Sequence, residues 1–340
     1  MMGSATLDMS KPIRSLLRNT GIQVFLDTPG VTEVAINRPG EIWTEKEAIW
    51  QRHEMPNLNY HACNEVAETL ATAISDNDDE LKNIICPVIL PDGQRGQIVM
   101  PPVAERGCIS LTIRQPSAKR FSLEDYVATG RLSNYSLVSA RMELREFEKE
   151  MLVCMRNNNM ERFMQLAVKH KLNILFGGAT GSGKTTFTKA VADLYPRDRR
   201  YITIEDVHEL TMPYHPNKVH LFFGKHMSAT KVVESCMRMK GDHIFMSELK
   251  GDETWSYMGL LNTGHDGSLT TSHFSNCRTA WSRLTTLVKQ SPVGMTLDHD
   301  FIYRTIQSTI DVICFWEGSF LKEVYFDPER KLALLNGEAA

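Results

Sequence analysis

The chain has 340 residues, a formal net charge of −3 and 42% hydrophobic residues. This balance is typical of a globular protein large enough for two domains. It gives no bulk indication of a nucleic-acid binder, although a local basic surface stays open. No apolar run approaches the roughly 20 residues that span a bilayer, and the N-terminus lacks the apolar segment of a secretory signal peptide. We therefore expect any membrane association to be peripheral and to occur through a partner.

Seven cysteines are scattered along the sequence without a C-x-x-C pair. An odd and dispersed set favours reduced thiols over a disulfide framework, which indicates a cytoplasmic protein. We expect most of these cysteines to be small buried apolar residues.

Residues 1–116 are predicted to form an N-terminal α/β domain that lacks the signature of a parallel sheet. Hydrophobic spacing predicts a short helix around residues 13–17 and a second helix over 60–74. One face of the second helix holds four apolar residues: Val66, Leu70, Ala73 and Ile74. Apolar or alternating runs between turn residues predict strands at 31–37, 42–50, 86–90, 94–100 and 108–114, with the turn at 91–93 closing a hairpin.

Residues 117–142 are polar and rich in turn formers, which predicts a linker. The remaining chain, 143–340, is predicted to be a second α/β domain. It opens with one or two helices over 143–170. From residue 172 onward short apolar strands alternate with amphipathic helices, which is typical of a mostly parallel sheet covered by helices.

A phosphate-binding loop is the most informative motif of the sequence. The pattern G-x-x-x-x-G-K-[ST] is met by Gly178, Ala179, Thr180, Gly181, Ser182, Gly183, Lys184 and Thr185. A strand predicted over 172–176 precedes this loop, and a helix predicted over 186–194, opened by Thr186, follows it. Backbone amides and the positive end of a helix dipole would then face the phosphates of ATP.

Two side chains of this loop have expected roles in the binding of ATP. Lys184 would reach the β- and γ-phosphates, and the Thr185 hydroxyl would hold Mg²⁺. We count Thr186 among the nucleotide-binding residues as well. The alternative is a glycine- and serine-rich surface loop that is followed by an ordinary helix.

Two later strands end in carboxylates. The run 201–204 ends at Glu205 and Asp206, and the run 243–247 ends at Glu248. Acidic residues at the carboxyl end of a parallel strand lie on the ligand-binding edge of a sheet. There they hold Mg²⁺ through water or orient the water that attacks the γ-phosphate. The alternatives are a solvated acidic pair at Glu205 and a helix cap at Glu248.

Two histidines and two arginines complete the candidate set. His265 and His273 flank the predicted strand 269–272, where a histidine can donate a hydrogen bond to a γ-phosphate oxygen and so report the nucleotide state. Arg95 and Arg114 in the first domain can clamp nucleotide phosphates. As alternatives, the histidines are core residues and the arginines are surface salt-bridge partners. A metal site at the histidines is disfavoured because no third ligand stands at suitable spacing.

Taken together, the motifs resemble those of one family. They read G-A-T-G-S-G-K-T-T, I-T-I-E-D-V-H-E-L, R-M-K-G-D-H-I-F-M-S-E-L-K-G-D-E and T-G-H-D-G-S-L-T-T-S-H, preceded by P-D-G-Q-R-G-Q and S-L-T-I-R-Q-P-S. This order is similar to the Walker A loop, Asp box, Walker B strand and His box of the secretion-superfamily ATPases. It is most similar to the traffic ATPases of type IV secretion and conjugation systems. The resemblance covers about residues 20 to 326.

The resemblance implies a hexameric ring of chains, each with an N-terminal sheet-containing domain and a C-terminal RecA-like ATPase domain that binds ATP and Mg²⁺. It implies that Glu205 and Glu248 are catalytic glutamates, with Lys184 and His273 beside them, and that His265 opens the His box. It also implies that Arg95 and Arg114 contact phosphates. The chain departs from the family pattern at Ser247 (usually glycine), Gly241 (usually proline) and Lys250 (usually arginine).

We therefore expect an ATP-hydrolysing ring motor that works with other secretion components at the cytoplasmic face of the inner membrane. Substrate transfer and pilus assembly are its implied tasks, and direct nucleic-acid binding stays open. The alternatives are an ATPase of type II secretion or of pilus extension or retraction, a nucleotide-gated docking scaffold with little turnover, and a P-loop kinase of a small metabolite. The absence of C-x-x-C disfavours the four-cysteine zinc element that type II relatives often carry.

Overall fold

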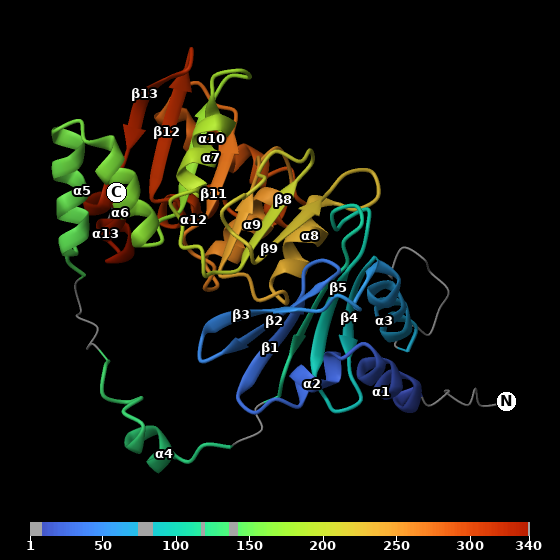
Figure 1. Cartoon of the computed structure of the whole chain (residues 1–340). Coiled ribbons are helices and arrows are strands. Elements are labelled where there is room, and N and C mark those ends of the chain that lie inside the picture. Colours follow the sequence, from blue (N-terminus) through green and yellow to red (C-terminus); the bar gives the residue numbers. More distant parts are fainter. Residues whose placement is uncertain (1–8, 74–83, 117–119, 136–141, 339–340) are drawn as a thin grey trace. The chain divides into compact units, whose positions relative to one another are not determined.

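The computed structural model describes residues 9–73, 84–116, 120–135 and 142–338 (Figure 1). The contacts divide the chain into two compact units. The first unit combines residues 1–116 with 196–247, and the second combines 117–195 with 248–340. The domain boundaries expected from the sequence, with 143–340 as one domain, stay a prediction.

An antiparallel sheet of six strands forms the first part of unit one, in the order β3-β2-β1-β6-β5-β4. Its strands are β1 (Val31–Ile36), β2 (Glu41–Lys46), β3 (Ile49–Glu54), β4 (Ile85–Ile89), β5 (Arg95–Val99) and β6 (Ser110–Arg114). The predicted hairpin is confirmed, because β4 pairs with β5 antiparallel. The strands expected over 42–50 are also present, as β2 and β3.

Three helices pack on this sheet: α1 (Ser10–Asn19), α2 (Ile22–Leu26) and α3 (Tyr60–Thr72). Helix α3 begins where the Asn59 side chain accepts a hydrogen bond from the Ala62 amide, a common helix cap. The helix predicted over 60–74 ends earlier than expected, so Ala73 is exposed rather than part of the buried face. Ile74 lies outside the described residues.

Unit one also contains three parallel strands in the order β10-β8-β9: β8 (Tyr201–Glu205), β9 (Lys218–Phe222) and β10 (His243–Met246). Helix α8 (Ala229–Cys236) packs on β8 and β9. Every residue of β8 and β10 is buried, as expected for parallel strands. The predicted strand over 201–204 is confirmed, and Glu205 is its last residue.

The sheet strands of unit two are β7 (Ile174–Gly178), β11 (Leu269–Ser272), β12 (Val312–Glu317) and β13 (Phe320–Tyr325), in the order β13-β12-β7-β11. Strand β7 lies parallel to both β11 and β12, whereas β13 pairs antiparallel with β12. The reversal follows from a two-residue turn in which Gly318 and Ser319 both have positive φ, the conformation that favours a tight hairpin. The α/β class and the mostly parallel second sheet are thus confirmed.

Nine helices are described in unit two. They are α4 (Leu123–Ala128), α5 (Glu146–Arg156), α6 (Met160–Lys169), α7 (Lys184–Ala192), α9 (Glu253–Leu261), α10 (Cys277–Val288), α11 (Pro292–Thr296), α12 (His299–Thr309) and α13 (Pro328–Leu335). The pair α5 and α6 accounts for the helices expected over 143–170. Helix α4 lies in the segment predicted as a linker and buries none of its residues.

Two general expectations can be compared with the described ranges. No helix there combines the length and the apolar character that crossing a membrane requires. All seven cysteines carry free thiols, and six of them are buried.

Candidate functional site

The phosphate loop connects β7 to α7. Strand β7 begins two residues later than predicted, and helix α7 begins two residues earlier than predicted. Lys184 and Thr185 therefore belong to the first turn of α7. Gly178 has a φ of 145°, and a β-carbon there would lie 2.2 Å from the Trp316 carbonyl oxygen. Gly183 caps α7 in the left-handed region without a side-chain bond to the first turn, which leaves this helix end suited to an anion.

Lys184 is buried and folds back onto the loop that precedes it. Its Nζ donates hydrogen bonds to the carbonyl oxygens of Gly178 (2.7 Å) and Ala179 (2.9 Å). The ammonium group therefore holds the loop in its present shape with two neutral acceptors. A phosphate oxygen carries a full charge and makes a stronger hydrogen bond than a carbonyl does, so it can compete for this group.

A cavity of about 590 Å³ opens beside the loop, within the size range of ligand pockets. It is lined by residues 178–182, 273–275 and 315–318. The Ser182 hydroxyl is buried and has no hydrogen-bond partner among the described residues. An unsatisfied buried hydroxyl in a phosphate loop fits a ligand that brings its own acceptor.

Glu248 and His273 meet beside the phosphate loop. The Glu248 carboxylate lies 2.8 Å from His273 Nε2 and 3.1 Å from Lys250 Nζ. His273 Nδ1 lies 3.0 Å from the Gly178 carbonyl oxygen, which can only accept, so this nitrogen carries a proton in that contact. The Gly178 carbonyl thus accepts from both Lys184 and His273.

Two hydrogen bonds hold the segment after Glu248 beside the strand that precedes His273. The Leu249 amide donates to the Thr271 carbonyl (2.8 Å), and the Ser272 hydroxyl donates to the Leu249 carbonyl (3.0 Å). The capping alternative for Glu248 does not match the contacts, because Glu253 accepts the amide hydrogens of Lys250 and Gly251 before α9. His273 is exposed, so it is not a core residue.

Glu205 is fully buried in unit one and already satisfied. Its carboxylate accepts hydrogen bonds from the Thr203 hydroxyl (2.7 Å) and from the amides of Glu209 (2.7 Å) and Leu210 (2.8 Å). Burial alone would raise the pKa of Glu205, but the neighbouring His220 side chain and the hydrogen bonds from Thr203 and the two amides outweigh it and lower the pKa to about 2.

Two histidines near Glu205 were not among the sequence candidates. His208 Nδ1 lies 3.5 Å and His220 Nδ1 lies 3.6 Å from the Glu205 carboxylate, and the three side chains offer ligand atoms within 4.8 Å of one another. Thr203 donates to Glu205 and lies 2.7 Å from His220 Nδ1, so His220 donates to the Thr203 hydroxyl. The spacing E-D-V-H is the sequence signal that could have found His208. His220 is reached only through the pairing of β8 with β9.

We predict that Glu205→Gln destabilises the folded chain by about 3 kcal/mol at pH 7, because a lowering of the pKa from 4.5 to about 2 stabilises the ionised folded state by about that amount. This contribution is present above pH 4.5 and is lost as the pH falls towards 2. The difference between variant and wild type should therefore shrink at pH 3. Urea unfolding at both pH values measures it.

Glu209→Gln is the matched control, since that side chain is exposed and only its backbone amide contacts Glu205. Equal unfolding free energies for wild type and Glu205→Gln at pH 7 would show that the hydrogen bonds to this carboxylate do not stabilise the fold.

The two candidate arginines are direct cross-strand neighbours in unit one, because β5 and β6 pair Arg95 with Arg114. Arg114 in turn lies opposite Glu33 on β1, at 3.7 Å from its carboxylate. Arg95 is exposed and forms no hydrogen bond or ion pair with any residue that the structure describes. Two like charges directly opposite each other repel, and a bound anion would relieve that repulsion.

Burial raises the pKa of Glu33 to about 7, against the opposing effect of Arg114. Near neutral pH this carboxyl is therefore only partly charged, and it neutralises Arg114 incompletely.

His265 does not join the other candidates. It precedes β11, whereas His273 follows that strand. Because β11 and β7 run parallel, His273 and the phosphate loop lie at the same edge of the sheet, and His265 lies towards the opposite edge. We leave His265 out of the site that we propose. Thr185 and Thr186 lie in the first turn of α7, as half-buried and exposed residues respectively.

Comparisons with known proteins identify the family of the chain. The family model described as type II/IV secretion system protein matches residues 134–315. The type IV secretion system protein VirB11 of Brucella abortus biovar 1 (strain 9-941) is 37% identical over 328 residues, which cover 92% of this chain and 90% of the relative. The protein of the same name from Bartonella henselae is 36% identical over 337 residues, covering 93% of this chain and 94% of the relative.

A solved structure agrees over nearly the whole chain. The VirB11 ATPase from the Brucella suis type IV secretion system, crystallised in complex with sulphate, superposes with a TM-score of 0.91 at 35% identity. The match covers 97% of this chain and 99% of that one. The expected fold class is thereby confirmed. The family match and the relatives together show that the chain belongs to the type II/IV secretion system protein family, as a type IV secretion ATPase similar to VirB11.

Proposed function

We propose that this ATPase binds its nucleotide at the phosphate loop and cleaves it with Glu248 and His273. The observation that supports this assignment is that Lys184 and His273 both contact the Gly178 carbonyl and Glu248 contacts His273, beside a cavity of about 590 Å³. The phosphates would take the place of the Gly178 and Ala179 carbonyls at Lys184. They would also accept from the loop amides and from the Ser182 hydroxyl.

The donor set of the loop also fits Mg²⁺. The hydroxyl of Thr185 and the Glu248 carboxylate, in part through water, would hold the ion, and it would neutralise charge on the phosphates. Oxygen ligands of this kind are those that Mg²⁺ prefers.

Glu248, rather than Glu205, is the glutamate that we propose to orient the attacking water. The Glu248 side chain is 18% exposed and contacts only His273 and Lys250 among the described residues. Glu205 is fully buried, and its carboxylate is already occupied by three hydrogen bonds. Water attacks the γ-phosphorus, the bond to the β–γ bridging oxygen breaks, and ADP and phosphate are formed. Glu248 accepts a hydrogen bond from the water as it attacks.

His273 is the residue that we propose to sense the γ-phosphate. Its Nδ1 proton now binds the Gly178 carbonyl, and a γ-phosphate oxygen would offer a charged acceptor in its place. Arg95 and Arg114 remain proposed phosphate ligands, because Arg95 is exposed without a described partner and Arg114 has only a partly charged one. Lys250 gives Glu248 a point contact instead of the planar fork of an arginine.

We further propose that the chain acts as a hexameric ring with other components of a type IV secretion system, at the cytoplasmic face of the inner membrane. Relatives at 37% and 36% identity over more than nine-tenths of the chain are named type IV secretion proteins, which disfavours a small-metabolite kinase. The same relatives disfavour a pilus or type II motor.

Light scattering on the purified chain tests the ring. With Mg²⁺ and a non-hydrolysable ATP analogue, we expect a particle whose mass is that of a hexamer, and we expect ATP turnover per chain to rise with protein concentration. A particle that stays monomeric while it hydrolyses ATP at full rate would overturn the ring. An assembly without turnover would favour the docking scaffold instead.

A further inference from the structure

A second hollow lies next to the nucleotide cavity within unit two. It has a volume of about 300 Å³ and shares the wall formed by residues 273–275 with the larger cavity. Its other wall is helix α10, which contributes Thr279, Ser282, Arg283 and Thr286. These four residues follow the spacing of one helix face, so they form a continuous strip. Among the residues that the structure describes, no acidic side chain lines this hollow.

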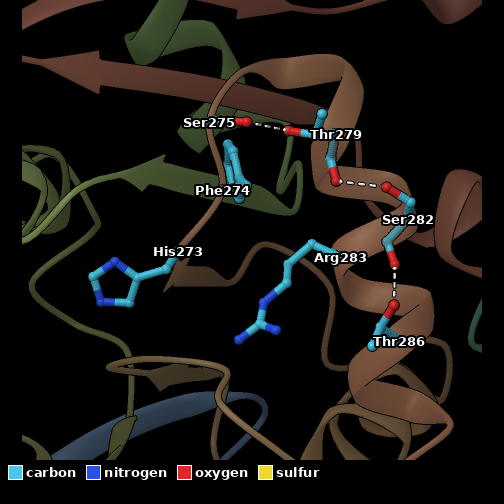
Figure 2. A pocket seen from close by; sticks show the side chains of 7 residues that line it. All are labelled: His273, Phe274, Ser275, Thr279, Ser282, Arg283 and Thr286. Carbon is cyan, nitrogen blue, oxygen red and sulfur yellow. Dashed lines mark hydrogen bonds between the residues drawn. The ribbon is translucent and has the colours of Figure 1, made fainter.

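Hydroxyl groups dominate the lining. The Ser275 and Thr279 hydroxyls lie 3.3 Å apart, the Ser282 hydroxyl donates to the Thr279 carbonyl (3.1 Å), and the Thr286 hydroxyl donates to the Ser282 carbonyl (2.9 Å) (Figure 2). A hydroxyl that is bonded to its own helix can rotate towards a better acceptor at little cost, because it keeps one hydrogen bond in either state.

Arg283 is the charged group of this hollow, and it lacks a partner among the described residues. Its Nε is shielded from solvent without a hydrogen-bond acceptor, and the side chain forms no ion pair with any residue that the structure describes. Figure 2 shows the guanidinium extending from the helix towards the side of the pocket where His273 lies. A buried, unpaired donor on a cation costs free energy, and such groups are normally satisfied by an acceptor.

We infer that Arg283 and the hydroxyls of α10 bind inorganic phosphate. Guanidinium and hydroxyl donors without a carboxylate recognise a tetrahedral oxyanion, and a hollow of this size has room for one phosphate with its bridging waters. The shared wall at His273 puts this subsite beside the place where the proposed reaction releases phosphate. The inference rests on the proposed function, and it makes the hollow the site that the released phosphate occupies first.

The test compares wild type with Arg283→Gln, and with Arg278→Gln as the matched control. Arg278 lies on the same helix, is exposed and does not line the hollow. Binding of inorganic phosphate is measured on the nucleotide-free chain by the broadening of its ³¹P resonance, with chloride at equal ionic strength as reference. Inhibition of ATP hydrolysis by added phosphate is measured in parallel. We expect Arg283→Gln to weaken both effects at least about tenfold, and Arg278→Gln to leave both unchanged.

Equal phosphate effects in Arg283→Gln and Arg278→Gln would overturn the subsite, as would an absence of phosphate binding to wild type at about 10 mM. If Arg283→Gln does not fold, Arg283→Lys keeps the charge without the planar fork, and a phosphate affinity equal to wild type would then contradict the inference. Arg283-dependent phosphate binding without any ATP turnover would contradict the proposed function and support the subsite. ATP turnover without Arg283-dependent phosphate binding would support the proposed function and contradict the subsite.

Discussion

Lys184→Ala is expected to lower the steady-state rate of ATP hydrolysis at least about a hundredfold, because it removes the one ammonium group of the phosphate loop. A single preorganised donor that faces developing charge contributes about a hundredfold to a thousandfold in rate. In the structure the same ammonium bridges the Gly178 and Ala179 carbonyls. The variant should therefore also lose order in the loop, which hydrogen exchange of the amides at 179–183 would detect.

Lys189→Ala is the matched control, since Lys189 is exposed in the last turn of the same helix. It should hydrolyse ATP at the wild-type rate with the same melting temperature. If Lys184→Ala hydrolyses ATP as fast as this control does, the phosphate loop is not the site of the reaction.

Glu248→Gln is expected to reduce turnover by about a hundredfold to a thousandfold while ATP still binds, because the amide keeps the size of the side chain but is a far weaker acceptor for the attacking water. The affinity for a fluorescent ATP analogue should change by less than about threefold. Rapid-quench measurement of one turnover separates the chemical step from product release.

Glu234→Gln, an exposed glutamate of α8, serves as the control for the loss of one negative charge. The comparison with Glu205→Gln then distinguishes the two strand-end glutamates. We expect Glu205→Gln to lose stability first and Glu248→Gln to lose turnover alone. A Glu248→Gln variant with normal turnover would assign the water to another group.

Local motifs were predictable because their geometry is set by neighbours in the chain. The glycines at 178, 181 and 183 fixed the phosphate loop, although its flanking elements began two residues away from their expected bounds. The position of His273 beside Glu248 followed from strands that end at one edge of a parallel sheet. The same rule puts His265 at the other edge, because it precedes β11, although the motif grouped it with His273.

Features that depend on packing between distant segments were not predictable. Arg200 looked ordinary in the sequence, yet it is fully buried and hydrogen-bonds Asn37, Asn217 and Thr112. These bonds help to group residues 196–247 with the first unit. Arg283 was likewise unremarkable, because its lack of a partner appears only when the whole lining of the hollow is known.

The lysine that closes the phosphate loop has a consequence for selectivity. Lys184 already has two acceptors at 2.7 and 2.9 Å, so an incoming anion must offer more than two carbonyl dipoles do. Chloride has one diffuse charge and no fixed acceptor geometry, so its contact would offset little of the free energy lost when both bonds break. A triphosphate would replace them with several charged oxygens at once. The two carbonyl contacts of Lys184 would therefore favour an anion with several charged oxygens, such as the proposed triphosphate, over chloride.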